Sequence, residues 1–140
     1  MRTRPFPLFL ALAALACGLT CCSWTSRQKV TEWMDTVPQE AVYDFSGEWL
    51  INPAKSTWMI SYAPMQLKQM ETRIIGTFDA YGILGVVNRE RVILFGLRED
   101  VVYYTWHLTL VPGAKELVGK QCEGFWPEVT GKKCYDVAFQ

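Results

Sequence analysis

The chain has 140 residues, of which 14 are basic and 14 are acidic, so its formal net charge is zero. Without Arg2 and Arg4 near the N-terminus, the chain is slightly acidic and has no basic stripe of the kind that binds nucleic acid. Nucleic acid is therefore not an expected partner, and the remaining length fits one domain of about 100 residues.

Residues 1–22 form a predicted lipoprotein-type signal segment and anchor region. Arg2 and Arg4 give it a basic start, and the stretch 6–16 is apolar. This stretch is shorter than the roughly 20 residues that a helix needs to cross a bilayer, and the combination is typical of a secretory signal. The alternative is an uncleaved membrane helix that continues to Trp24. We expect a protein of the bacterial cell envelope that is anchored to a membrane and faces the periplasm or the exterior.

Cysteines near the end of this segment can carry the lipid. The stretch 13–17 ends in Ala16-Cys17 and resembles a bacterial lipobox, which makes Cys17 the first candidate and Cys22 the alternative. In such lipoproteins the thiol carries diacylglycerol, and acyl chains such as palmitate contribute about 0.8 kcal/mol per buried CH₂. The other interpretation is that a different signal peptidase removes some of these cysteines.

Cys122 and Cys134 are far from the signal segment. The stretch 123–133 between them contains proline and two glycines and is predicted to be a loop. Export would place the two thiols in an oxidising compartment, where a disulfide persists. A metal site would need more ligands, and His107 is the only histidine. The sequence therefore predicts a Cys122–Cys134 disulfide, no metal and no cofactor.

Residues 23–42 are predicted to be a linker with a short helix. Apolar side chains recur at helical spacing on one face: Val30, Trp33, Met34 and Val37. Such a helix could lie on the membrane surface or pack on the following domain. Packing is favoured because the polar face has no basic array.

Residues 43–140 are predicted to form the domain itself, which is all-β with about eight short strands. Turn residues recur every 8 to 12 positions, which is typical of a sandwich or a barrel. The expected strands are 47–52, 58–69 with an interruption near Pro64, 72–79, 82–87, 91–97, 101–111, 116–122 and 134–139.

The residue pattern within the strands favours a closed barrel. The longest strand has a continuous apolar row at every second position: Val102, Tyr104, Trp106, Leu108 and Leu110. Four strands each contain a glycine, which usually marks a bulge, a bend or a close backbone approach: Gly76, Gly85, Gly96 and Gly119. We therefore expect a single closed antiparallel meander barrel, which would leave no exposed strand edges.

A family resemblance points to the same fold. Gly47-x-Trp49 resembles the first-strand motif of lipocalin-type barrels, and 73–78 resembles the strand rhythm of small bacterial lipocalin-like lipoproteins. The resemblance extends from Tyr43 to the C-terminus. It implies a small β-barrel that binds an apolar or amphipathic small molecule.

Four aromatic residues are the predicted ligand-binding residues of the barrel mouth: Trp49, Phe78, Tyr104 and Trp106. An eight-stranded barrel is just wide enough to be filled by side chains or to hold one small ligand. The alternative is therefore that these four rings fill the interior themselves.

The middle strands are apolar on both faces, for example at 83–87 and 92–95. An exposed apolar sheet face marks an interaction site, so the alternative function is that of a non-catalytic lipoprotein that docks another envelope protein. The sequence has no Gly-rich phosphate loop, metal-ligand motif or nucleophile elbow, and its one histidine has no evident catalytic partner. We do not expect an enzyme.

Overall fold

The computed structural model describes residues 26–125 and 133–140. The predicted signal segment, with Cys17 and Cys22, lies outside the described residues. In chain order the elements are α1 (Arg27–Met34), β1 (Gly47–Trp49), the 3₁₀ helix η1 (Pro53–Lys55), β2 (Met65–Met70), β3 (Arg73–Phe78), β4 (Tyr81–Asn88), β5 (Arg91–Arg98), β6 (Val101–Leu110), β7 (Leu117–Glu123) and β8 (Cys134–Phe139).

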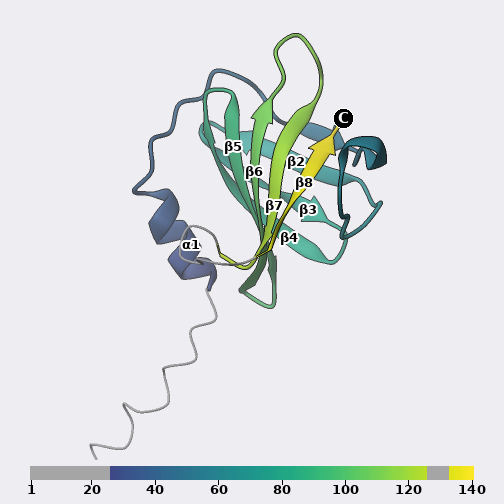
Figure 1. The fold of residues 1–140 in the computed structure, drawn as a ribbon. Coiled ribbons are helices and arrows are strands. Elements are labelled where there is room, and N and C mark those ends of the chain that lie inside the picture. The colour runs from purple at the N-terminus through teal and green to yellow at the C-terminus, as the bar shows by residue number, and fades with distance from the viewer. Residues whose placement is uncertain (1–25, 126–132) are drawn as a thin grey trace, which may run out of the picture.

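The strands form one antiparallel meander of eight strands in the order β1 to β8, which curls into an open half-barrel (Figure 1). Two-residue turns connect each strand to the next from β2 through β6. In the two-residue turn between β5 and β6, Glu99 and Asp100 both have positive φ, at 53° and 61°. Such a turn matches the twist of the strands on either side. The all-β meander predicted from the sequence is confirmed, and the helix that precedes it is present.

The prediction of a closed barrel is wrong. β1 has only three residues, because the chain leaves the sheet before Pro53 and forms η1. Proline has no backbone N–H and cannot continue a ladder. Among the described residues β1 is not paired with β8. The chain after β1 instead contacts the last strand through an isolated bridge between Ile51 and Phe139 and through hydrogen bonds that include Leu50 N to the Gln140 carbonyl at 2.8 Å.

Two strand glycines allow neighbouring backbones to approach closely. A Cβ at Gly119 would lie 1.8 Å from the His107 carbonyl oxygen, and one at Gly76 would lie 2.0 Å from the Gln66 carbonyl oxygen. No side chain fits at these distances. The close approach predicted for these glycines is present, but it curls the sheet without closing it.

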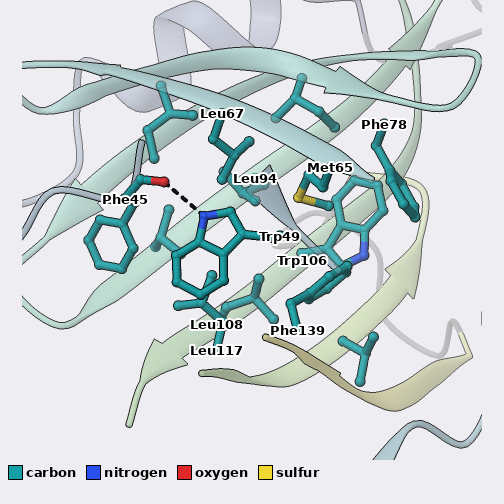
Figure 2. Close-up of a cluster of buried hydrophobic side chains, with 14 of the residues drawn as sticks. Phe45, Trp49, Met65, Leu67, Phe78, Leu94, Trp106, Leu108, Leu117 and Phe139 are labelled. Carbon is teal, nitrogen blue, oxygen red and sulfur yellow. Dashed lines mark hydrogen bonds between the residues drawn. The ribbon is translucent and has the colours of Figure 1, made fainter. Parts of the chain in front are cut away.

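The concave face of the sheet holds the main core (Figure 2). Trp49, Phe78 and Trp106 all pack in it, and their exposed fractions are 3%, 0% and 0%. The Phe78 ring meets the Trp106 ring edge-on with 5.8 Å between centroids. Aromatic pairs prefer this arrangement, which fills the half-barrel with large side chains.

Helix α1 packs on the convex face over the middle strands. The Ser26 hydroxyl caps its start by accepting a hydrogen bond from the Lys29 N–H. Val30 and Met34 are buried against a second cluster that contains Phe95 and Leu97 of β5. The sequence-based expectation that this helix packs on the domain is confirmed.

The direction of α1 relative to the sheet is fixed at both ends. At its start, Ser26 bridges Val101, and Arg27 N donates to the Asp100 carbonyl at 3.1 Å. Beyond its end, Glu40 N donates to the Val87 carbonyl at 3.2 Å. The helix therefore begins beside the β5–β6 turn, and the chain that follows it reaches the opposite end of the sheet.

Candidate ligand pocket at one end of the half-barrel

The four predicted ligand-binding residues do not form one site. Phe78 and Trp106 lie in the middle of the core with no exposed surface. Tyr104 is partly buried at the end of the sheet where β6 begins. Trp49 is buried as well, but it lines a hollow at the opposite end. Only Trp49 of the four therefore contributes to the pocket described below.

This hollow has a volume of about 450 Å³, within the range of small-molecule sites. Three segments surround it: the chain before β1, the β4–β5 turn and the β6–β7 turn. The β6–β7 turn follows from its sequence, since Pro112-Gly113 favours a turn and Gly113 has a φ of 75°. We refer to this hollow as the Trp49 pocket.

The Trp49 indole is fixed in place and has a cation above it. Its Nε1 donates to the Phe45 carbonyl at 2.9 Å (Figure 2). The Lys115 ammonium lies 5.3 Å from the ring centroid and also donates to the Glu48 carbonyl at 3.2 Å. A lysine over a tryptophan face is attracted by the ring's electron density. The pocket thus has one positive charge beside an aromatic ring.

Carboxylates and apolar side chains complete the lining. The Asp44 carboxylate accepts a hydrogen bond from the Ser46 backbone N–H at 2.9 Å, and this bond holds the pKa of Asp44 below its usual value. Glu90 lies on the rim, and its carbonyl accepts a hydrogen bond from Leu110 N at 2.8 Å. Apolar surface comes from Leu110 to Pro112. The lining is amphipathic, and a compact charged group next to an apolar body would match it.

The opposite end of the half-barrel has an aromatic cluster, of which only Tyr104 was predicted from the sequence as a ligand-binding residue. It consists of Trp58, Tyr81, Tyr103, Tyr104 and Tyr135, and we call it the aromatic end. The centroid distances are 5.4 Å for Trp58–Tyr135 and for Tyr81–Tyr104, and 6.0 Å for Tyr81–Tyr103. Burial, followed by the proximity of Tyr81, raises the pKa of Tyr104. The sequence signal was weak because these rings come from four separated segments.

A buried polar pair lies between the two ends. Gln121, 1% exposed, accepts a hydrogen bond at 2.9 Å from the Trp106 indole N–H. Among the described residues no acceptor lies within hydrogen-bonding distance of its Nε2. This pair was not predicted from the sequence, although a glutamine at an inward strand position is a signal that indicates it.

His107 lies on the convex face of the sheet, outside the Trp49 pocket. Its side chain lines a hollow of about 400 Å³ with Arg91 and Ile93, and burial lowers its pKa. Across 26–125 and 133–140, no cluster of three His, Cys, Asp or Glu residues could hold a metal ion. In the same ranges, no helix is long and apolar enough to span a membrane.

The predicted disulfide is confirmed. Cys122 of β7 and Cys134 of β8 are directly paired across the two strands and are bonded to each other. The bond joins the last two strands at the end of the sheet where the loop between them begins and ends.

Comparison with known proteins gives no relative: no protein-family model, no curated protein and no solved structure matches the chain. The resemblance of Gly47-x-Trp49 to lipocalin-like barrels therefore stays a prediction.

Proposed function

We propose that the protein is a non-catalytic, lipid-anchored envelope protein whose half-barrel binds an amphipathic small molecule in the Trp49 pocket. The observation that carries the proposal is the Lys115 ammonium 5.3 Å above the centroid of the Trp49 ring, inside a hollow of about 450 Å³. The filled core leaves little room for a ligand between the strands, so binding at the mouth fits the structure better than binding deep inside.

The lining favours a ligand with an apolar body and a negatively charged head. The apolar body would lie against the Leu110–Pro112 wall, and the head would meet the Lys115 ammonium. The carboxylates of Asp44 and Glu90 repel anions, so the head must contact the Lys115 ammonium directly, and a second negative charge would weaken binding. A single anionic head on a hydrocarbon or aromatic body is therefore the expected class.

Substitution of Lys115 tests the pocket with the amphipathic anionic dye anilinonaphthalene sulfonate as the probe. Lys115→Met keeps most of the apolar stem but removes the charge that pairs with the sulfonate, so the dye should bind about two- to fivefold more weakly, the usual effect of losing a partly exposed ion pair. Dye fluorescence titrated against the folded protein gives the dissociation constant.

Lys120→Met is the matched control. Lys120 is an exposed lysine of β7 that is paired with Asp136, away from the pocket. The Lys120→Met substitution should leave the affinity for the dye unchanged. Equal weakening in both variants, or none in either, would show that the Trp49 pocket is not the binding site.

The lipid anchor is the second part of the proposal. It is supported by the sequence of residues 1–22, which lie outside the described residues. Cys17 is the expected acceptor, so the mature protein should begin at Cys17 and have the added mass of a diacylglycerol and of any further acyl chain. Intact mass spectrometry of protein from membranes measures this directly. A mature chain that begins at Cys22 identifies the alternative acceptor, and an unmodified mass contradicts the anchor.

The docking alternative has less support than the sequence indicated. β4 and β5 are apolar on both faces because some of their outward side chains are apolar. These outward side chains are buried beneath α1 and Phe125; they include Val86, Phe95 and Leu97. The chain therefore covers this part of the face itself.

A further inference from the structure

The aromatic end has partly exposed rings that nothing else in the described chain covers completely. Trp58 and Tyr103 are 41% and 42% exposed, while Tyr81, Tyr104 and Tyr135 are half-buried beside them. The rings form a continuous series from Tyr135 through Trp58 and Tyr104 to Tyr81 and Tyr103. An aromatic surface of this kind at one end of a domain needs an explanation, because water solvates it poorly.

The N-terminal part of the chain enters the domain at this same end. Ser26 bridges Val101, and the Arg27 side chain pairs with Asp100 at 3.0 Å in the β5–β6 turn. Tyr103 follows that turn directly on β6. Figure 1 shows the C-terminus at the other end of the sheet, where β8 ends. The Trp49 pocket lies at that end as well, because the β6–β7 turn lines it.

The length of chain before Ser26 limits how far this end can be from the membrane. At roughly 3.5 Å per residue, even a fully extended chain from Ser26 spans only about 15 Å to Cys22 and about 30 Å to Cys17. A lipid on either cysteine therefore holds the first described residue close to the bilayer surface.

We propose that the aromatic end contacts the lipid–water interface of the membrane that holds the anchor. The inference rests on the proposed lipid anchor. Tyrosine and tryptophan combine an apolar ring with one polar group, and they concentrate at the level of the lipid headgroups for this reason. The lipid supplies one point of attachment and the ring surface a second, so the domain has a fixed orientation.

The charges at this end indicate which lipids are needed. The turns beside the rings contain the acidic residues Asp79, Glu99 and Asp100. The nearby cations are Arg98 at the end of β5 and Arg27, which pairs with Asp100, so this end has no basic array. Contact therefore depends on the rings and does not require anionic lipid. In this orientation the Trp49 pocket faces away from the membrane and is open to the aqueous side.

Two matched tryptophan reporters test the orientation in the full-length mature protein. Tyr103→Trp places a reporter at the aromatic end, and Tyr43→Trp places one at the opposite end, on a residue that is similarly exposed at 47%. Each protein is reconstituted in phosphatidylcholine vesicles with or without brominated acyl chains, which quench nearby indoles. The fluorescence of the wild-type protein is subtracted.

The added fluorescence of Tyr103→Trp should be quenched at least about twofold more strongly than that of Tyr43→Trp, as expected for an interfacial ring. Trp58→Phe provides a second measurement, since it should remove part of the quenched signal from the parent protein. Vesicle flotation reports on the anchor separately. Protein that floats while both reporters are quenched equally, or not at all, overturns the orientation but leaves the anchor standing. Protein that does not float at all overturns both.

Discussion

Trp106→Ala is expected to lower the free energy of unfolding by about 3–5 kcal/mol, the usual cost of truncating a buried tryptophan. The ring is completely buried and contacts Phe78 and Tyr104. It also lies against Gly96, where an added Cβ would come within 2.9 Å of the indole. Because the curled sheet is shaped around this ring, the cavity will collapse only in part. Urea denaturation of the variant and the parent gives the difference.

Part of this cost comes from Gln121, which loses the indole N–H that its amide oxygen accepts. A buried polar group without a partner costs about 1–3 kcal/mol. Adding Gln121→Leu to Trp106→Ala should therefore recover stability, whereas Gln121→Leu alone should destabilise the parent. The double-mutant cycle measures this coupling between the two side chains.

Tyr62→Ala is the control for these substitutions. Tyr62 is 68% exposed, so its removal should change the free energy of unfolding by no more than about 0.5 kcal/mol. If Trp106→Ala were as mild as Tyr62→Ala, the ring would not be the centre of the core.

Loss of the Cys122–Cys134 bond is expected to lower the free energy of unfolding by about 3 kcal/mol in the chain-entropy model. The two residues are 12 positions apart, and the bond restricts the unfolded chain between them. The double variant Cys122→Ala/Cys134→Ala should show this loss as a lower denaturation midpoint in urea.

The reduced parent protein separates the cross-link from the packing of Cys122, which is 3% exposed. Reduction breaks the bond and keeps both sulfur atoms. If the bond itself stabilises the fold, the reduced parent and the double variant should unfold at similar urea concentrations. If the reduced protein were as stable as the oxidised one, the prediction would be contradicted. The destabilisation of the double variant would then come from the lost packing of the cysteine side chains.

Most of the fold could be predicted from the sequence because its strands have strong local signals. The alternation in β6 and the turn residues after β4 and β5 placed these elements within a residue or two of their observed bounds. The spacing of Val30, Trp33 and Met34 also identified α1 and its buried face. Closure could not be predicted in the same way, because it depends on how β1 meets β8, and these strands are far apart in the sequence.

The candidate site was less predictable than the fold. Trp49 was identified from its motif, but Lys115 and Asp44 reach it from turns whose positions depend on the whole sheet. Phe78 and Trp106 have the same local pattern as ligand-binding aromatics, since alternation shows that a ring points inward but not whether it fills a core or lines a cavity. The interior volume decides between the two, and it is a property of the assembled half-barrel.

The hydrogen bonds between the chain after β1 and the outer edge of β8 have a consequence for solubility. An open sheet has free edges that can pair with the strands of other molecules and start aggregation. Here the N–H groups of Leu50, Asn52 and Thr57 donate to the carbonyls of Gln140, Ala138 and Asp136, every second residue along that edge. Pro53 within this strip has no N–H to offer a further strand. The irregular strip therefore protects the last strand from edge-to-edge association with neighbouring copies.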